Sequence, residues 1–93
     1  MIIVCYDFVS NTKRARFAKF LKGYGNKIQY SVYAINNSKR VLQNMLTEIE
    51  HSYKKSFENT DHILIFEVCE TCKKKIHRYG AASHEIEDVV YLE

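Results

Sequence analysis

The chain has 93 residues, of which 46% are hydrophobic, and a formal net charge of +3. This length predicts one domain over residues 1–93, marginally stable alone and helped by a dimer interface. No run of about 18 apolar residues occurs, which excludes a transmembrane helix. The N-terminus also lacks the pattern of a cleaved leader, so we expect a cytoplasmic protein.

The basic residues gather in the first half of the chain. Residues 1–46 hold eight Lys or Arg and one acid, whereas residues 47–93 hold six Lys or Arg and ten acids. A basic half favours an anionic partner, and nucleic acid is the usual one. An uneven but solvated surface is the simpler explanation of the charge alone.

A strand and a helix open the chain. Residues 2–8 are apolar and β-branched or aromatic, which is typical of a central strand. Ser10 or Asn11 can cap the helix that follows, and this helix runs to about Tyr24. Its core stripe recurs at helical spacing and comprises Phe17, Phe20, Leu21 and Tyr24.

A bent strand follows the first helix. Gly23 and Gly25 stand where the helix stops, and either is suited to left-handed backbone. Residues 27–35 alternate in polarity and predict a strand that bends into two short ones. One side of it comprises Ile28, Tyr30, Val32 and Ala34.

A second helix is expected from about Lys39 to Ser56, capped by Ser38. Its buried face comprises Val41, Leu42, Met45, Leu46, Ile49 and Tyr53. Residues 62–69 predict another apolar strand. Shorter strand-like runs follow at 76–79 and at 88–92.

This order predicts an α+β domain, with two helices on one face of an antiparallel sheet. The arrangement is the ferredoxin-like β-α-β-β-α-β fold with an additional C-terminal strand. That strand, at about residues 88–92, follows a loop without a helical crossover. We therefore expect it to pair with the partner subunit's sheet in a homodimer.

Asp7 is the only acidic residue among the first 46, and it ends the first apolar strand. A carboxylate at a strand tip, beside a basic helix, suits a group that holds a metal or meets a phosphate. Mg²⁺ needs several oxygen ligands, so a metal here requires a second Asp7 from a symmetric partner. The simpler alternative is that Asp7 caps the turn after the strand.

Three features together resemble a known family: Tyr6-Asp7 at a strand end, Arg14 and Arg16 on the next helix, and the block Gly-Asn-Lys-Ile-Gln-Tyr-Ser-Val-Tyr at 25–33. This pattern resembles the second of the two near-universal CRISPR-associated protein families, the small subunit of the spacer-acquisition machinery. The resemblance covers essentially the whole chain. It implies a ferredoxin-like homodimer that holds a short DNA duplex between two dimers of a companion CRISPR integrase. Some members are magnesium-dependent endonucleases acting on RNA or double-stranded DNA.

The resemblance also implies roles for single residues. Asp7 matches the catalytic, metal-binding aspartate of the family, and Arg14 and Arg16 match basic positions near it. Lys27 stands where arginine is frequent, which keeps the charge but loses the planar fork. Tyr33 matches an aromatic position, for which a place at the dimer seam is one interpretation and ordinary strand alternation the other.

Further nucleic-acid contacts are expected from Lys13 and Lys19 on the first helix and from Ser31, whose hydroxyl can donate to a phosphate oxygen. A solvated helix face is the alternative for the lysines.

Cys69 and Cys72 form a Cys-x-x-Cys motif that can chelate zinc, but zinc takes four ligands and three lysines follow directly. A redox role lacks a thioredoxin-like strand-helix context in this pattern. We therefore expect a turn with half-buried thiols. The four histidines show no spacing that pairs them with Cys or Asp, and we assign them no catalytic role.

The leading hypothesis is a dimeric DNA-binding scaffold for spacer acquisition, with a magnesium-dependent endonuclease site at paired Asp7. The alternatives are a toxin-like ribonuclease and a non-catalytic RNA-binding module of the same fold. The pattern contains no dedicated general base, and it leaves the choice between RNA and DNA open.

Overall fold

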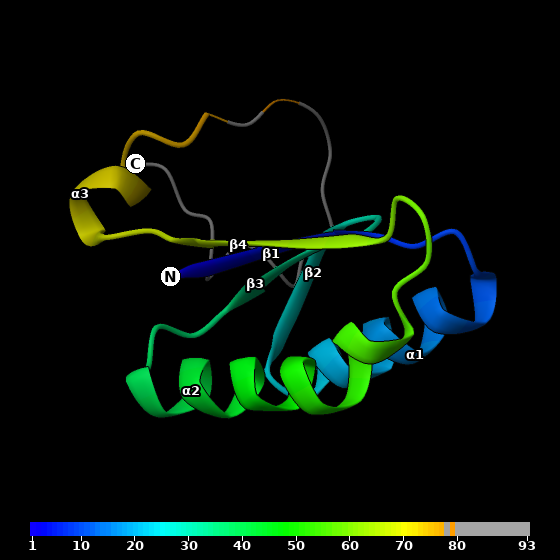
Figure 1. Cartoon of the computed structure of the whole chain (residues 1–93). Coiled ribbons are helices and arrows are strands. Elements are labelled where there is room, and N and C mark those ends of the chain that lie inside the picture. Colours follow the sequence, from blue (N-terminus) through cyan, green and yellow to red (C-terminus); the bar gives the residue numbers. More distant parts are fainter. Residues whose placement is uncertain (78, 80–93) are drawn as a thin grey trace.

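The computed structural model describes residues 1–77 and 79. The chain there follows the expected order of strands and helices (Figure 1). Its elements are β1 (Ile2–Asp7), α1 (Asn11–Lys22), β2 (Gly25–Gln29), β3 (Val32–Ile35), α2 (Lys39–Glu48), β4 (His62–Glu67) and α3 (Glu70–Lys73). The C-terminal strand expected at 88–92 lies outside the described residues.

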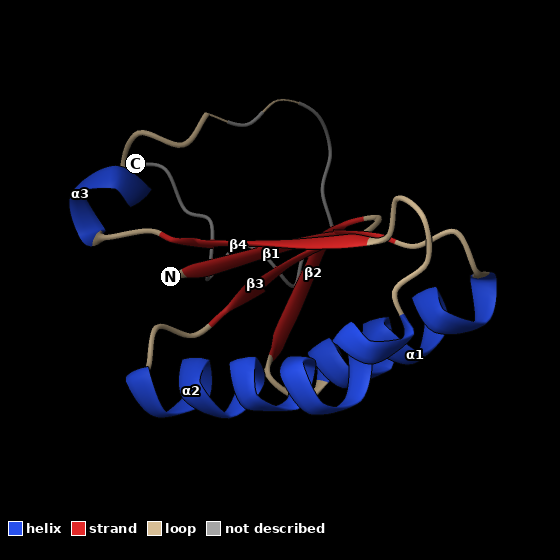
Figure 2. Cartoon of the chain, in the orientation of Figure 1, coloured by secondary structure: helices blue, strands red, loops and turns tan. Residues whose placement is uncertain are grey.

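The four strands form one antiparallel sheet in the order β2-β3-β1-β4, with α1 and α2 on the same face (Figure 2). This confirms the expected α+β class. β1 lies in the interior of the sheet, as its apolar run predicted, and β4 forms one edge. Among the described residues, no helix is long and apolar enough to cross a membrane.

The core lies between the sheet and the two long helices. Phe17 of α1 is fully buried at its centre, and its ring lies 5.0 Å from that of Tyr6 and 5.4 Å from that of Phe8. Tyr53 packs on the other side of Phe17, also at 5.0 Å. Such tilted and edge-to-face contacts stabilise an aromatic core beyond simple burial. They fix α1 against the tip of β1.

Both helix starts are capped as expected. The Ser10 hydroxyl accepts a hydrogen bond from the backbone N–H of Lys13, and the Ser38 hydroxyl accepts one from Val41. α2 continues to Ser56 through a wider turn at Ile49–Tyr53 and a tight turn, so the predicted extent is confirmed.

The bent strand is a β2–β3 hairpin. The turn contains Ser31, whose φ of 66° lies in the left-handed region. Gly25 permits the close approach of the two strands, because a Cβ there would lie 2.1 Å from the carbonyl oxygen of Ala34. Neither glycine after α1 takes the left-handed conformation for which it is suited, since Gly23 has a φ of −72° and Gly25 lies in β2.

Three expectations are corrected in the described residues. Leu46 is 37% exposed rather than part of the buried face of α2, because Met45 takes the fully buried position. Ile76, His77 and Tyr79 are not in a strand. The segment after β4 instead forms the short helix α3, which begins at the motif expected to be a turn.

The face of the sheet opposite the helices carries apolar side chains. Ile3 lies between Ala34 and Phe66, and Cys5 lies between Val32 and Leu64, as cross-strand neighbours. Phe66 and Leu64 are 50% and 51% exposed. We call this surface the open face, comprising Ile3, Cys5, Val32, Leu64 and Phe66 around Ala34, which is itself buried in a second, smaller apolar cluster with Met1.

Candidate functional site

Asp7 ends β1 at the rim of the open face. Its neighbours Tyr6 and Phe8 are buried in the core beneath the helices. Because successive strand side chains alternate between faces, the exposed Asp7 carboxylate belongs to the opposite side. Two copies meeting through their open faces would therefore bring apolar surfaces together with Asp7 at the margin.

His62 is the cross-strand neighbour of Asp7 in the β1–β4 pair. Its Nδ1 lies 2.9 Å from the carbonyl oxygen of Thr60. A carbonyl only accepts, so Nδ1 carries the proton and Nε2 is left as an acceptor. The sequence assigned His62 no role, because 54 residues separate it from Asp7 and only strand pairing makes them neighbours.

A buried carboxylate holds the loop that follows Asp7. The Asp61 side chain is fully buried, and its two oxygens accept hydrogen bonds from the backbone N–H groups of Val9 and Glu58, both at 2.8 Å. The Val9 N–H is the main cause that lowers the pKa of Asp61. Sequence reasoning missed Asp61, although an Asp in the polar turn before an apolar strand was a usable signal.

The ammonium of Lys13 belongs to this structural cluster. It lies 2.9 Å from the Glu58 carboxylate and 3.7 Å from that of Asp61, and it donates to the Ser56 carbonyl. Only 18% of the Lys13 side chain is exposed. The structure thus places this predicted phosphate contact in the support of a loop, and its nucleic-acid role stays a prediction.

A basic groove runs between α1 and the β2–β3 hairpin. Two adjoining hollows, of about 320 and 980 Å³, share Ala15, Ala18, Lys27 and Tyr33 as lining residues. We call this surface the basic groove after its four cationic residues, Arg14, Lys19, Lys22 and Lys27. No Asp or Glu is among its described lining residues.

Tyr30 joins the two sides of the groove. Nη1 of Arg14 donates to the Tyr30 hydroxyl at 3.3 Å, while Nζ of Lys27 lies 5.7 Å from the Tyr30 ring centroid. Nη2 of Arg14 also donates to the carbonyl of Phe8 at 2.9 Å. Tyr30 is 68% exposed.

Tyr6, Ser31 and Tyr33 complete the groove near the turn. Burial raises the pKa of the Tyr6 and Tyr33 phenols, so both stay neutral at physiological pH. Tyr33 is 2% exposed and packs in the core on the helix side. Strand alternation therefore places Tyr33 on the side of the sheet opposite Asp7, and its place at a dimer seam stays a prediction.

The structure brings Arg14, Lys27, Ser31 and Tyr33 together along one hollow, and their role in binding nucleic acid stays a prediction. Arg16 lies elsewhere, with its guanidinium 5.9 Å from the Tyr53 ring centroid. Asp7 is on the other face of the sheet, although the backbone hydrogen bond from Tyr6 to Ser31, 3.2 Å long, ties its strand to the groove.

Metal binding within one copy finds little support. Across residues 1–77 and 79, no three His, Cys, Asp or Glu side chains cluster as a metal site. Asp7 supplies one carboxylate, and Mg²⁺ prefers carboxylate oxygens while keeping several waters. The donor type thus fits magnesium, provided that a second copy brings its own Asp7.

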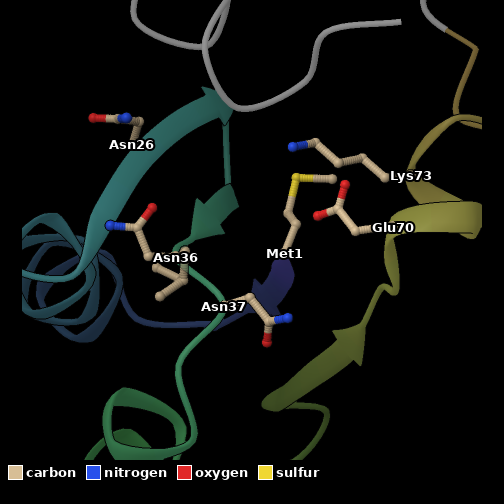
Figure 3. Close-up of a pocket in the computed structure, with 7 residues that line it drawn as sticks. Met1, Asn26, Asn36, Asn37, Glu70 and Lys73 are labelled. Carbon is tan, nitrogen blue, oxygen red and sulfur yellow. The ribbon is translucent and has the colours of Figure 1, made fainter.

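A third hollow, of about 270 Å³, lies by the N-terminus (Figure 3). Met1, which directly precedes β1, lines this hollow. Glu70 and Lys73 of α3 form one of its walls. Asn26 of β2 and Asn36 and Asn37 of the β3–α2 loop form the other wall. This hollow has one acidic and one basic lining residue, so it lacks the uniform charge of the groove.

Comparison with known proteins finds a family match over residues 1–76, to CRISPR associated protein Cas2. The CRISPR-associated endoribonuclease Cas2 4 of Rhodospirillum rubrum is 33% identical over 85% of the chain, which spans 61% of that relative. The CRISPR-associated endoribonuclease Cas2 2 of Methanospirillum hungatei is 32% identical over 96% of both chains. The crystal structure of a hypothetical protein from Thermus thermophilus has the same fold, with a TM-score of 0.71, 23% identity and coverage of 88% and 92%.

Proposed function

The chain belongs to the CRISPR associated protein Cas2 family, and from this premise we propose that it is a dimeric nucleic-acid-binding subunit for spacer acquisition. We further propose a magnesium-dependent endonuclease site formed by paired Asp7. The names of its relatives, as endoribonucleases, support phosphodiester cleavage as the kind of reaction.

The basic groove is the observation that carries the proposal. Four cationic side chains line it without a carboxylate among the described lining residues, so an anionic polymer gains attraction along the whole length. Lysine and arginine contacts to phosphate position a duplex but read no sequence. That suits a subunit that must accept DNA of any sequence and present it to a companion integrase.

The open face supports a homodimer. Leu64 and Phe66 expose large apolar surfaces beside Cys5 and Ile3, and a second copy is the partner that also completes a two-carboxylate site. In this proposal the ferredoxin-like domains join through their sheets. The strand expected at 88–92 would then pair with the partner subunit's sheet, whose β4 edge takes an added strand.

In this proposal, Asp7 and His62 have different catalytic roles at the rim of the open face. The Asp7 carboxylates of two copies would hold Mg²⁺, which supplies Lewis acidity at the phosphate and lowers the pKa of bound water. Nε2 of His62, whose ring is held by the contact of Nδ1 with the Thr60 carbonyl, would be the group that accepts a proton at this rim. His62 thereby fills the place of the general base that the sequence pattern lacked.

The salt dependence of binding tests the groove. We expect a Lys19→Ala, Lys22→Ala, Lys27→Ala variant to bind duplex DNA more weakly, with the slope of log K against log salt reduced by about 0.9 for each phosphate that is no longer neutralised. A matched variant, Lys39→Ala, Lys55→Ala, Arg40→Ala, removes the same charge outside the groove-lining set. Equal slopes for the two variants would contradict a groove-bound backbone.

Cleavage is tested separately from binding. Asp7→Asn should abolish magnesium-dependent hydrolysis while leaving the salt slope unchanged, because Asp7 lies outside the groove. Array expansion and copurification with the integrase then assign the role in vivo. Expansion that survives Asp7→Asn would make the subunit a scaffold without catalysis in that pathway.

A toxin-like ribonuclease is the second candidate, favoured by the word endoribonuclease in the relatives' names. It predicts growth arrest on expression that Asp7→Asn relieves, with RNA rather than DNA degraded. The same binding assay with single-stranded RNA tests the non-catalytic RNA-binding module as well.

A further inference from the structure

The Cys-x-x-Cys motif lies directly between a strand and a helix. β4 ends at Glu67, Cys69 caps α3, and Cys72 lies within that helix. The strand-helix context that was missing from the sequence pattern is therefore present. Both thiols are exposed rather than half-buried, because α3 leaves them on the surface.

The two cysteines contact each other directly. The backbone N–H of Cys72 donates to Sγ of Cys69 at 3.3 Å, so the two residues of the motif are in direct contact at the start of α3. Residues three apart at a helix start have Cα atoms about 5 Å from each other. That separation falls within the range that a disulfide requires.

These contacts make the two thiols unequal. The backbone N–H of Cys72, followed by its thiol, lowers the pKa of Cys69. The same side-chain contact raises the pKa of Cys72. Cys69 is thus the group that forms a thiolate first, and Cys72 keeps its proton as the donor. An attacking and a resolving cysteine need this division.

Zinc is the weaker explanation of the pair. In the part of the chain that the structure describes, no third His, Cys, Asp or Glu joins the two thiols as a metal cluster. Three lysines follow Cys72 in the sequence and repel a cation. A structural zinc site takes four protein ligands.

We propose that Cys69 and Cys72 are a redox-active dithiol that exchanges with disulfides of the glutathione class. The Cys69 thiolate attacks one sulfur of the disulfide, and the other sulfur leaves as a thiolate. Cys72 loses its proton and attacks the Cys69 sulfur of the mixed disulfide, releasing the second thiolate. Two electrons pass from the dithiol to the small disulfide, and the two thiol protons end on the two released thiols.

A disulfide between Cys69 and Cys72 would close a covalent ring at the first turn of α3. The segment is anchored just after β4, where the Met1 amino group donates to the Val68 carbonyl at 3.0 Å and the Val68 N–H donates to the Met1 carbonyl at 2.7 Å. Oxidation therefore fixes the start of α3 beside the hollow of Figure 3, where Glu70 and Lys73 form a wall.

Cys5 provides the internal control. It lies on β1, it is partly buried, and burial raises its pKa. We expect Cys69 to be alkylated by N-ethylmaleimide at neutral pH at least about tenfold faster than Cys5. Equal rates at Cys5, Cys69 and Cys72, read by peptide mass spectrometry, would overturn the proposal.

Titration of the full-length protein with glutathione disulfide tests the bond itself. The wild type and Cys5→Ser should each lose two free thiols in a thiol count. Their intact mass should fall by the mass of two hydrogen atoms, without a stable adduct. Cys72→Ser should accumulate one glutathione adduct on Cys69, and Cys69→Ser should form its adduct on Cys72 about tenfold more slowly. Serine preserves the N-cap of α3, so folding does not confuse the result. A wild type that keeps all thiols, or ends as mixed adducts, would overturn the exchange.

Discussion

At the scale of single residues, the support of Asp7 depends on a carboxylate far away in the sequence. The Asp61 carboxylate accepts hydrogen bonds from the backbone N–H groups of Val9 and Glu58, and the Lys13 ammonium lies 3.7 Å from it. The three contacts tie α1, the loop after Asp7 and the start of β4 together. The position of Asp7, the candidate catalytic carboxylate, therefore depends on Asp61, which lies outside the proposed site.

Asp61→Asn should lower the melting temperature by roughly 5 °C, because an amide supplies one acceptor where the carboxylate supplies two. The lowered pKa means that this stabilisation is present above the unfolded value of about 3.9 and is lost as pH falls through the folded value. Melting curves between neutral and acid pH should show a steeper acid loss for the wild type. Glu58→Gln, whose carboxylate is largely exposed, is the control, and equal acid losses for all three proteins would contradict the assignment.

His62 has a separate prediction, which rests on the proposed cleavage. His62→Gln should lower kcat by about 100-fold, while binding of nucleic acid is unchanged. His51→Gln, also exposed, is the matched control. A His62→Gln variant that keeps the wild-type kcat would show that His62 only supports the strand end.

At the scale of elements, the β2–β3 hairpin decides the width of the groove. β2 supplies Lys27, the turn supplies Tyr30 and Ser31, and the pairing of Gly25 with Ile35 fixes their register. The strands approach so closely that only a glycine fits at position 25. The hairpin therefore positions the cation of Lys27 against α1.

Gly25→Ala should destabilise the protein by about 2 kcal/mol, because the new Cβ would lie 2.1 Å from a backbone oxygen that cannot move without the strand. Gly23→Ala is the matched control. Its Cβ would meet the Phe20 oxygen at an ordinary 3.5 Å, and its φ suits alanine, so stability should stay the same or rise by about 0.5 kcal/mol. Urea unfolding measures both, and equal midpoints would contradict the close approach.

At the scale of the whole molecule, the two faces of the sheet carry different side chains. The helix face holds the core, and the open face exposes Leu64 and Phe66. Asp7 belongs to the open side, whereas the basic groove runs along α1 and β2. Self-association and nucleic-acid binding would therefore use separate surfaces of one small domain.

Leu64→Asp should weaken the homodimer by about 30-fold or more, since it places a charge in an apolar interface. Leu46→Asp changes a similarly exposed leucine on α2, and its dimer should be unaffected. Sedimentation velocity over a concentration series measures both. A wild type that remains monomeric, or a Leu64→Asp dimer of unchanged affinity, would contradict association through the open face.

Local chemistry and periodicity predicted most of the elements. The caps at Ser10 and Ser38, the core stripe with Phe17 and Leu21, and the four strands all follow from near neighbours in the chain. The grouping of Arg14 with Lys27 and Ser31 came from the family resemblance, and the hairpin packed on α1 brings them together.

Tertiary structure alone decided the contacts between distant segments. Strand pairing places His62 beside Asp7. The fold also buries Asp61 under the β1–α1 loop, where it forms an ion pair with Lys13. Strand alternation places Tyr33 and Asp7 on opposite sides of the sheet. Periodicity describes which face a residue occupies within its own element, whereas its neighbours from other elements depend on register and packing, which have no local signature in the chain.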